Sequence, residues 1–522
     1  MNKAILLFLF LLVASRMQAT VLNVPSQYFT IQSALDSCSQ GDTVMVAPGT
    51  YYEHLVWPDV SNIKLFSSGN KTNTIIDGSK SGRVITIDML NANVINKGTH
   101  IKGFTITRGG ITLSEATPSG EGAGVLLNNA SPKFTNCNFT KNYIVSGATI
   151  STNLIGKGVG ISCKKSQATF TKCLFKSNTS KFINEIYGSA LYAENSSISF
   201  TDCEVSENST KTAFENQGQA AGVIHAVNST LNILRCSITG NEIRDNSETY
   251  PSGIITVIEG SAEIVNTMLR DNTHWGASEI SPEGSAIYGD HSDLYILNVT
   301  SNQNGSVFGL TGPSLYLVNF ASNTITVQNS IFWNNGANDE IYTDNSGVIS
   351  VTYSDVKSFT LYPGIGNINV NPQFISIPGD NLSLTPGSPC AGTGSLLNAP
   401  DNDIMGTPRP LPAGTNPDMG CYEINQPLKV DGMVSCCSGF VVYPNPSNGN
   451  FAIDLQIDNA NNEPASIEII NSLGQIIYTQ SVKLTDDSPH QNISMPATCS
   501  EGLYFVRVKV IDQVFQQSIV YK

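Results

Sequence analysis

Six side chains with the chemistry to contact a sugar recur at intervals of about 31 residues in the middle of this chain. They form two columns two residues apart, with Tyr192, His225 and Tyr288 in the first and Lys164, Glu194 and Asp290 in the second. Flat aromatic rings stack on sugar rings, and His exchanges protons near neutral pH. Charged groups bond hydroxyls or carboxylates. If one face of a sheet presents both columns, the pattern predicts a surface that binds an extended polysaccharide or surface glycan.

A catalytic version of this face would use His225 as the base and Tyr192 as the proton donor. Hydrolysis requires two carboxylates about 5 to 9.5 Å apart. Glu194 and Asp290 lie three repeats apart, roughly 14 Å at the spacing of neighbouring strands, so they are a poor pair. A lyase requires a base and neutralisation of a uronate, which only Lys164 and His225 approach. A polysaccharide lyase or hydrolase is therefore the alternative to a glycan-binding or adhesive protein.

The same columns also contain Leu126, Val227 and Ile258. Polar and aromatic side chains are ordinary on a solvated sheet, so a surface spacer without a specific ligand is a third hypothesis. The sequence has no serine-hydrolase elbow, zinc-binding His pair, phosphate loop or CxxC pair. It therefore contains no complete catalytic motif, and we predict no cofactor and no metal ligands.

An internal repeat positions these columns. Each copy has two short alternating segments separated by a Ser/Asn turn, and the copies align on a small residue: Cys137, Cys173, Cys203, Cys236, Thr267, Val299 and Ser330. An apolar residue lies three positions before this anchor, beginning with Phe134 and Phe170. One copy cannot bury its inward face alone, but stacked copies form a continuous core. We predict an all-β fold, a right-handed parallel β-helix, because crossovers between parallel strands take that hand.

Two further columns have structural interpretations. An asparagine follows every anchor by five residues: Asn142, Asn178, Asn208, Asn241, Asn272, Asn304 and Asn335. Asn tolerates the left-handed backbone of a tight turn, and stacked amides can bond to one another. In the anchor column, period 2 points Cys137 outward unless a bend intervenes. Cysteines stacked in register have poor geometry for disulfides, so we expect free thiols.

The composition of the chain limits which partners the protein can bind and where it can be located. The formal net charge of −14 argues against nucleic acid and anionic membranes. Residues 1–19 have Lys3, an apolar run and small residues up to Ala19, the pattern of a signal peptide. No other stretch is long and apolar enough to span a bilayer. We therefore expect a secreted protein, either extracellular or on the outer cell surface.

Residues 31–38 are expected to form a helix that caps the first coil, because Ile31, Ala34, Leu35 and Cys38 fall at helical spacing. This opening stretch resembles that of exported β-helix proteins of the pectate-lyase-like superfamily. Gly49-Thr50-Tyr51-Tyr52-Glu53 is also similar to the first motif of pectin methylesterases. That family places its glutamines and two aspartates in further motifs that are missing here. Tyr51, Tyr52 and Glu53 are therefore interpreted as structural.

Residues 371–423 resemble the closing segment called the choice-of-anchor Q region in exported β-helix proteins. The resemblance rests on Asn371-Pro372, Leu382-Ser383-Leu384, Ser388-Pro389, Gly406-x-x-Arg409 and Asp418-Met419-Gly420-x-Tyr422-Glu423. The family pattern has alanine at positions 390 and 421, where this chain has cysteines, so we predict a Cys390–Cys421 disulfide that staples the cap. Asp401-Asn402-Asp403 reads as a calcium loop or as a turn. The later glutamate of a calcium loop is missing, which favours the turn.

The last part of the chain changes character. Residues 441–522 contain alternating strands with turn signals every 10 to 15 residues, typical of a small immunoglobulin-like β-sandwich. The segment resembles the C-terminal sorting domain of type IX secretion substrates in Tyr443-Pro444-Asn445-Pro446, Gly449, Asn471-Ser472-Leu473-Gly474, Gly502-x-Tyr504 and Lys522. The resemblance implies the type IX machinery as a partner. The predicted organisation is a signal peptide (1–19), a β-helix (20–423), a linker (424–440) and a sorting domain (441–522).

Overall fold

A computed structural model gives the fold of the chain. It describes residues 19–89, 98–147, 153–212, 218–244, 252–275, 285–306, 312–335, 337–344, 346–378, 381–425, 440–455, 464–471, 474–483, 490–496, 499–510 and 513–522. The predicted signal peptide and most of the predicted linker lie outside the described residues. The chain divides into two compact units, Met1–Gln426 and Pro427–Lys522.

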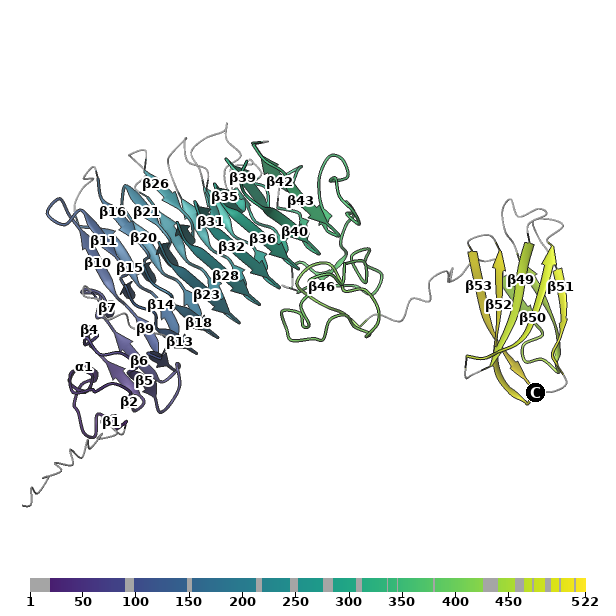
Figure 1. Cartoon of the computed structure of the whole chain (residues 1–522), viewed down its shortest axis with the longest axis horizontal. Helices are drawn as coiled ribbons and strands as arrows, with labels where there is room; N and C mark the ends of the chain where they lie inside the picture. The colour runs from purple at the N-terminus through teal and green to yellow at the C-terminus, as the bar shows by residue number, and fades with distance from the viewer. Residues whose placement is uncertain are drawn as a thin grey trace, which may run out of the picture. The chain divides into compact units, whose positions relative to one another are not determined.

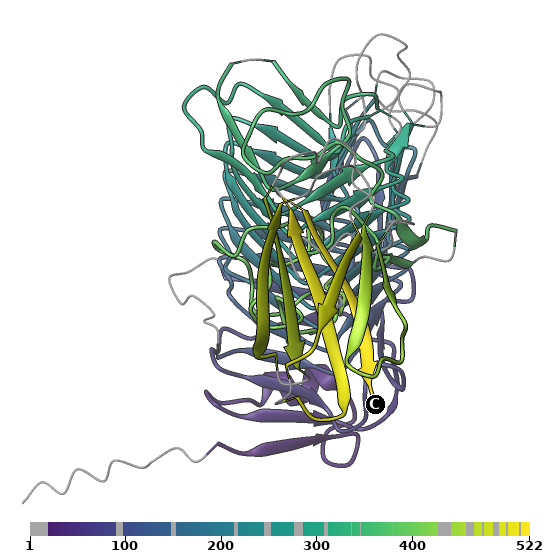
Figure 2. The same ribbon diagram turned by 90° about the vertical axis from the view of Figure 1, so that its right-hand side faces the viewer.

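The first unit is a right-handed parallel β-helix, as predicted (Figures 1 and 2). Three long parallel sheets enclose its core. Sheet 1 has ten strands, from β4 (Leu55–Val56) to β42 (Ile341–Thr343), and sheet 2 has twelve, from β1 (Val21–Val24) to β43 (Ile349–Thr352). Sheet 3 has eleven strands, from β3 (Gly49–Tyr51) to β44 (Asp355–Val356). Two shorter parallel sheets complete each coil, and their buried residues, such as Ile144 and Ile186, join the same core. Sheet 4 has seven strands from β10 (Gly110–Leu113) to β38 (Gly305–Ser306), and sheet 5 has four from β11 (Ser119–Glu121) to β26 (Gln219–Ala221).

A full coil contributes one strand to each of these five sheets. One such coil consists of β17 (Ile161–Lys164), β18 (Thr169–Thr171), β19 (Leu174–Lys176), β20 (Thr179–Lys181) and β21 (Glu185–Tyr187). The sequence predicted two strands in each repeat. The three strands after the anchor were missed, because each has only three residues in this coil, too few to show a period.

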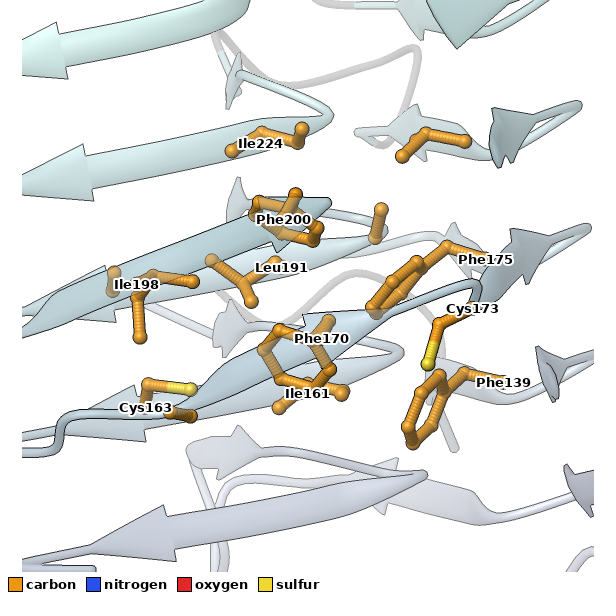
Figure 3. Packing of buried hydrophobic residues seen from close by; sticks show 14 of the residues in the cluster. Phe139, Ile161, Cys163, Phe170, Cys173, Phe175, Leu191, Ile198, Phe200 and Ile224 are labelled. Carbon is orange, nitrogen blue, oxygen red and sulfur yellow. The ribbon is translucent and has the colours of Figure 1, made fainter. Parts of the chain in front are cut away.

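The predicted inward aromatic column is confirmed. The rings of Phe134, Phe170 and Phe200 stack on one another with centroids 5.3 and 5.4 Å apart, and Phe139 stacks on Phe175 at 4.8 Å. Figure 3 shows four of these rings beside Ile161, Leu191 and Ile224 of sheet 1, namely Phe139, Phe170, Phe175 and Phe200. Because every strand pairs in register with the next coil, equivalent side chains lie about 4.8 Å apart along the stack.

The asparagine column forms the predicted ladder inside the β-helix. The Nδ2 of Asn178 donates to the Oδ1 of Asn208 at 2.9 Å, and Asn208 donates in the same way to Asn241 at 3.0 Å. The other bonds of the ladder join Asn142 to Asn178, Asn241 to Asn272, Asn272 to Asn304 and Asn304 to Asn335. Each backbone N–H also donates to the next Oδ1, as in the Asn178–Asn208 and Asn208–Asn241 pairs.

The ladder residues do not have the left-handed backbone that the sequence analysis assigned to them. The residue just before each one does, with φ between +51° and +66°: Lys141, Ser177, Glu207, Gly240, Asp271, Gln303 and Asn334. The preceding residue makes the turn, which leaves the asparagine side chain free to point inward and pair with its neighbours.

A similar turn determines the direction of the cysteine column. Asn136 has φ +52°, so the chain bends before Cys137 and turns that side chain inward. The four cysteines at this position are buried free thiols. The Sγ of Cys203, for example, donates to the carbonyl of Phe170 at 3.4 Å.

Helix α1 (Ile31–Asp36) lies at the first coil, with Thr30 as its N-cap. Its predicted apolar face is buried. The Glu53 carboxylate accepts the N–H groups of Ile31 and Gln32, both at 2.9 Å, so Glu53 is structural, as interpreted from the sequence. Strand β1 precedes the helix and pairs with β2 (Thr43–Val46).

Residues 381–425 bind along the β-helix at turns between sheets 2 and 3 and also contact Asp355 of β44. The Nδ2 of Asn298 donates to the carbonyls of Asp418 and Gly420, and the Nδ2 of Asn329 donates to the carbonyl of Ser395. Asn266 makes a similar bond to the carbonyl of Asn402. Strand β46 (Asn381–Leu384) pairs with β45 (Phe374–Ser376) at the start of this segment.

The predicted Cys390–Cys421 disulfide is wrong, because both residues are buried free thiols in the structure. Each cysteine has a partner in the β-helix instead. The Sγ of Cys390 donates to the Oδ2 of Asp355 at 3.1 Å, and the backbone N–H of Cys421 donates to the Oγ1 of Thr300 at 3.0 Å. A buried Arg409–Glu423 ion pair at 3.4 Å holds this segment together without a covalent staple.

Asp401-Asn402-Asp403 makes a turn. The Oδ1 of Asp403 accepts the N–H groups of Met405 and Thr407, and its Oδ2 accepts the N–H of Glu423. Backbone donors therefore occupy both carboxylate oxygens.

The second unit is a small antiparallel β-sandwich, as predicted. One sheet consists of β47 (Phe440–Tyr443), β48 (Asn450–Leu455) and β51 (His490–Ser494). The other consists of β50 (Ile476–Lys483), β49 (Pro464–Asn471), β52 (Gly502–Val510) and β53 (Gln513–Tyr521). Alternate apolar residues of the two sheets form its core, including Val442, Ile469 and Val506.

Candidate functional site

A cavity of about 460 Å³ lies where sheet 5 meets sheet 1. One wall is formed by β16 (Ile155–Lys157), β21 and β26 of sheet 5. The other wall is formed by β22 (Leu191–Glu194), β27 (Ile224–Val227), β31 (Gly253–Ile258) and β35 (Ser285–Asp290) of sheet 1. Its volume falls within the range of about 300–1,000 Å³ that is typical of sites for small ligands.

Glycines make the corner between the two walls. Gly158, Gly188 and Gly222 each follow a strand of sheet 5 and have φ of +61°, +72° and +66°. A Cβ at Gly188 would lie 2.2 Å from the carbonyl oxygen of Leu191, so only glycine fits this sharp turn. These glycines hold sheet 5 against the outer face of sheet 1, and the cavity forms between them.

The structure brings the predicted aromatic column together in this cavity. Tyr192, His225, Thr256 and Tyr288 pair in register across four neighbouring strands. The rings of Tyr192 and His225 are stacked, with centroids 5.7 Å apart and planes 10° apart. The sequence analysis placed these residues on an open face, but Tyr192, His225 and Tyr288 are each at least 95% buried. Side chains of sheet 5 pack against the first two.

The environment fixes the protonation of the two residues assigned to catalysis. Burial, helped by the charge of Lys157, lowers the pKa of His225 to about 3, so the imidazole is neutral at neutral pH. Its Nδ1 is buried without a hydrogen-bond partner. Burial and the nearby Glu194 raise the pKa of Tyr192, whose hydroxyl lies 3.1 Å from the Oε2 of Glu194 and stays protonated.

The second predicted column is only partly at the cavity. Asp290 lines it, and the Oδ1 of Asp290 lies 2.7 Å from the Nδ1 of His291. Glu194 lies behind Tyr192, 3.7 Å from the Nζ of Lys157. Lys164 points elsewhere and pairs with Glu121 at 2.6 Å. The roles of these residues in binding stay predictions.

Sequence reasoning missed the wall that sheet 5 provides. Tyr187 packs beside His225 with ring centroids 5.1 Å apart, and its hydroxyl donates to Glu185 and Gln219. Lys157 lies over the ring of Tyr192, 4.8 Å from its centroid. A usable signal existed: a glycine recurs three residues before the sheet 1 strand in successive repeats, as at Gly158 and Gly188.

The aromatic column continues for two coils beyond Tyr288, into the seventh aligned repeat and the coil after it. Tyr316 of β39 (Leu315–Val318) lies 5.7 Å from Tyr288, and Tyr342 of β42 stacks on Tyr316 at 4.5 Å, measured between ring centroids. Tyr342 is exposed. The later coils are shorter, and an alignment at a fixed period therefore missed both tyrosines.

Within the described residues, no three His, Cys, Asp or Glu side chains cluster in a way that could hold a metal ion. The helices in that part of the chain are all too short or too polar to cross a membrane.

Comparisons with known proteins identify the C-terminal unit. Residues 441–522 match the family of secretion system C-terminal sorting domains, and the chain therefore carries a type IX export signal for the cell surface or for secretion. No curated protein matches the chain.

Solved structures resemble the β-helix in fold. The pectin methylesterase from Aspergillus niger is 14% identical, and the match covers 67% of this chain and 84% of that one with a TM-score of 0.28. The pectin methylesterase PemA from Erwinia chrysanthemi is 12% identical, with 64% and 88% covered and a TM-score of 0.25.

Proposed function

We propose that this exported protein binds a glycan in the cavity between sheets 1 and 5. The observation that carries the proposal is a row of rings on one face of sheet 1, with its first three members at the cavity. Five of six neighbouring strands contribute a ring, Tyr192, His225, Tyr288, Tyr316 and Tyr342, and Thr256 takes the remaining position. Binding sites for sugars combine aromatic surface with a few fixed polar groups. A repeating row also suits a repeating polymer, because each coil offers a further contact.

The polar groups of the cavity are held in place before any ligand arrives. Tyr187 is tied to Glu185 and Gln219, and Lys157 is held between Glu194 and the ring of Tyr192. Side chains that are already ordered lose little conformational entropy on binding. These groups supply both donors and acceptors for sugar hydroxyls.

A glycan array probed with the full exported chain tests the proposal. We expect the chain to retain at least one class of polysaccharide, and the Tyr192→Ala and Tyr288→Ala variants to bind that glycan at least tenfold more weakly. Tyr295→Ala is the matched control, because Tyr295 lies on the outer face of sheet 2 in β36 (Asp293–Leu297), away from the cavity. Failure to retain any glycan would favour a surface spacer, and equal binding by all variants would place the site elsewhere.

One observation favours a lyase or hydrolase as a second candidate. The rings of His225 and Tyr192 stack in a cavity, so a base and a proton donor lie side by side. The low pKa of His225 makes it a weak base, which places this candidate second to binding. The test is the ultraviolet absorbance of unsaturated products, and the reducing ends released, from pectin, alginate and glycosaminoglycans. Activity that disappears in His225→Ala would support the enzyme. Unchanged polysaccharides would leave binding as the function.

A further inference from the structure

We propose that the outer face of sheet 2 binds the same face of a second copy of this chain, related by a two-fold axis that runs parallel to the strands. This interface is separate from the proposed glycan site, because the described lining of the cavity includes no residue of sheet 2. Figure 1 shows the strands of sheet 2 as one row along the β-helix, from β2 to β43. Their outer face has cations near one end and carboxylates near the other.

The cations lie on three neighbouring strands: β5 (Lys64–Ser67), β8 (His100–Lys102) and β13 (Lys133–Thr135). Lys64, His100 and Lys133 pair in register, and Lys102 lies two residues beyond His100 on the same face. Burial and the charges of the three lysines lower the pKa of His100, so its ring is neutral at neutral pH. Like charges on facing positions of neighbouring strands repel one another, so this end of the face favours an added negative charge.

The carboxylates of Glu263 and Asp293 lie on β32 (Ser261–Val265) and β36, towards the other end of the sheet. Strands β8 and β32 are five steps apart, roughly 24 Å at about 4.8 Å for each step. Charges so far apart are screened from one another at physiological ionic strength, where the Debye length is about 8 Å. The two ends of one face therefore do not neutralise each other.

The five charged side chains of the face are exposed: Lys64, Lys102, Lys133, Glu263 and Asp293. Within the described residues, none of the five has an ion-pair partner. Both ends of the face can therefore pair with charges from outside the molecule.

The order of the strands makes the two ends complementary under a two-fold rotation. In the twelve-stranded sheet, β5 and β8 are the third and fourth strands, and β32 and β36 are the ninth and tenth. A two-fold axis between the sixth and seventh strands, and parallel to them, places the third strand opposite the tenth and the fourth opposite the ninth. Lys64 of one copy then lies near Asp293 of the other, and Lys102 near Glu263, and each contact occurs twice. An in-plane axis perpendicular to the strands would instead place each lysine opposite the same strand of the other copy, which like charges disfavour.

The centre of the face allows the two sheets to approach closely. The sixth and seventh strands are β18 and β23 (Ser197–Thr201). Their outward side chains are small and uncharged: Thr169, Thr171, Ser197, Ser199 and Thr201. Sheets that pack face to face lie about 10 Å apart, a distance that long side chains at the axis would prevent.

A hollow at the acidic end suits a lysine side chain. A cavity of about 290 Å³ opens on this face, and Glu263, Asp293 and Tyr295 are among its lining residues. The carboxylates supply the opposite charge, and the ring of Tyr295 offers an apolar surface for the methylene stem of a lysine.

The size of the face predicts a weak dimer. Eight strands, from the third to the tenth, cover roughly 40 Å by 12 Å, so two copies bury about 1,000 Å² together. Interfaces below about 1,200 Å² belong to transient complexes. We therefore expect a reversible dimer that forms at micromolar concentrations and weakens as salt screens its ion pairs.

Sedimentation velocity of the full chain, over a range of protein concentrations and at about 25 and about 500 mM salt, tests the interface. We expect monomer and dimer in equilibrium, with a Kd at least tenfold weaker at the higher salt concentration. A monomer under all conditions would overturn the proposal. A monomer that binds heparin at low salt would overturn it too, because the cations would then serve an anionic ligand instead of a second copy.

Reversing the charges tests the contact itself. Lys102→Glu or Glu263→Lys alone should weaken the dimer at least tenfold, because each creates two pairs of like charges. An equal mixture of the two variants should form a dimer again, since every contact in the mixed dimer joins a cation to a carboxylate. Lys141→Glu is the matched control, because it changes the net charge equally on an exposed turn where a later coil has Glu207.

The control variant should keep the Kd of the unmodified chain. Equal Kd values for Lys141→Glu and the single variants, or no dimer in the mixture, would overturn the two-fold interface. If one of these variants does not fold, Lys64→Glu and Asp293→Lys give the same test at the second contact. Tyr192→Ala should leave the Kd of the dimer unchanged, so the dimer and the glycan site can fail independently.

Discussion

Removing one rung from the asparagine ladder should destabilise the β-helix far more than removing an outward-facing asparagine. The side chain of Asn208 has five bonds in the structure. Its Nδ2 donates to Asn241, to the carbonyl of Phe175 at 2.8 Å and to that of Ser206, and its Oδ1 accepts the N–H and the Nδ2 of Asn178. Asn208→Ala leaves the buried N–H of Asn178 without an acceptor. It also removes the donor to Phe175.

The size of the effect follows from these losses. An orphaned buried donor costs about 1–3 kcal/mol, and losing the remaining bonds and side-chain contacts brings the expected loss to about 2–4 kcal/mol. All three tryptophans, Trp57, Trp275 and Trp333, belong to the β-helix unit. Tryptophan fluorescence during urea unfolding therefore reports on this unit alone.

Asn232→Ala is the control, because Asn232 lies on the outer face of sheet 2 in β28 (Thr230–Leu234), in the same repeat as Asn241. We expect it to change the free energy of unfolding by less than about 0.5 kcal/mol. If Asn208→Ala were no more destabilising than Asn232→Ala, the ladder would not stabilise the stack and the reasoning would fail.

Three other predictions concern the closing segment and the corner of the cavity. Burial raises the pKa of Asp355 to about 7, well above its unfolded value near 4, so its contribution to stability should be full below pH 4 and lost as the pH rises through 7. Asp355→Asn should flatten that decline in urea titrations between pH 4 and 8, and an unchanged slope would contradict the assignment. Alkylation in denaturant without reductant should label both Cys390 and Cys421. If neither cysteine were labelled, a Cys390–Cys421 disulfide would be present and the assignment of free thiols would be wrong. Gly188→Ala should lower the free energy of unfolding, measured with urea, by about 2–4 kcal/mol. Gly240 has a similar φ but open space where a Cβ would lie, so Gly240→Ala should lower it by only about 1 kcal/mol.

The repeat explains why so much of the fold was predictable. Alternation and a fixed period place Phe134, Phe170 and Phe200 in one inward row, and the same arithmetic places Tyr192, His225 and Tyr288 in one outward row. Both follow from local pattern and stacking alone. The asparagine ladder was predictable for the same reason, since a side chain that recurs at one register must meet its own copies.

What the sequence analysis missed depends on bends and on contacts between distant segments. A single residue with a left-handed backbone, Asn136, reverses the direction in which the Cys137 side chain points. The alternation of apolar and polar residues in the sequence does not reveal this bend. Sheet 5 packs against part of the aromatic row because of turns at glycines such as Gly188, and its strands of three residues are too short to show a period. The Cys390–Cys421 pairing came from a family resemblance, whereas the fold separates the two thiols by giving Cys390 a carboxylate partner.

The most direct test of a glycan site between sheets 1 and 5 is a crystal structure of the chain with a bound oligosaccharide selected on the array. The account predicts sugar density in the cavity between sheets 1 and 5, against the residues that line it. Density on the outer face of sheet 2 around Tyr295, or an empty cavity beside a ligand bound elsewhere, would contradict it.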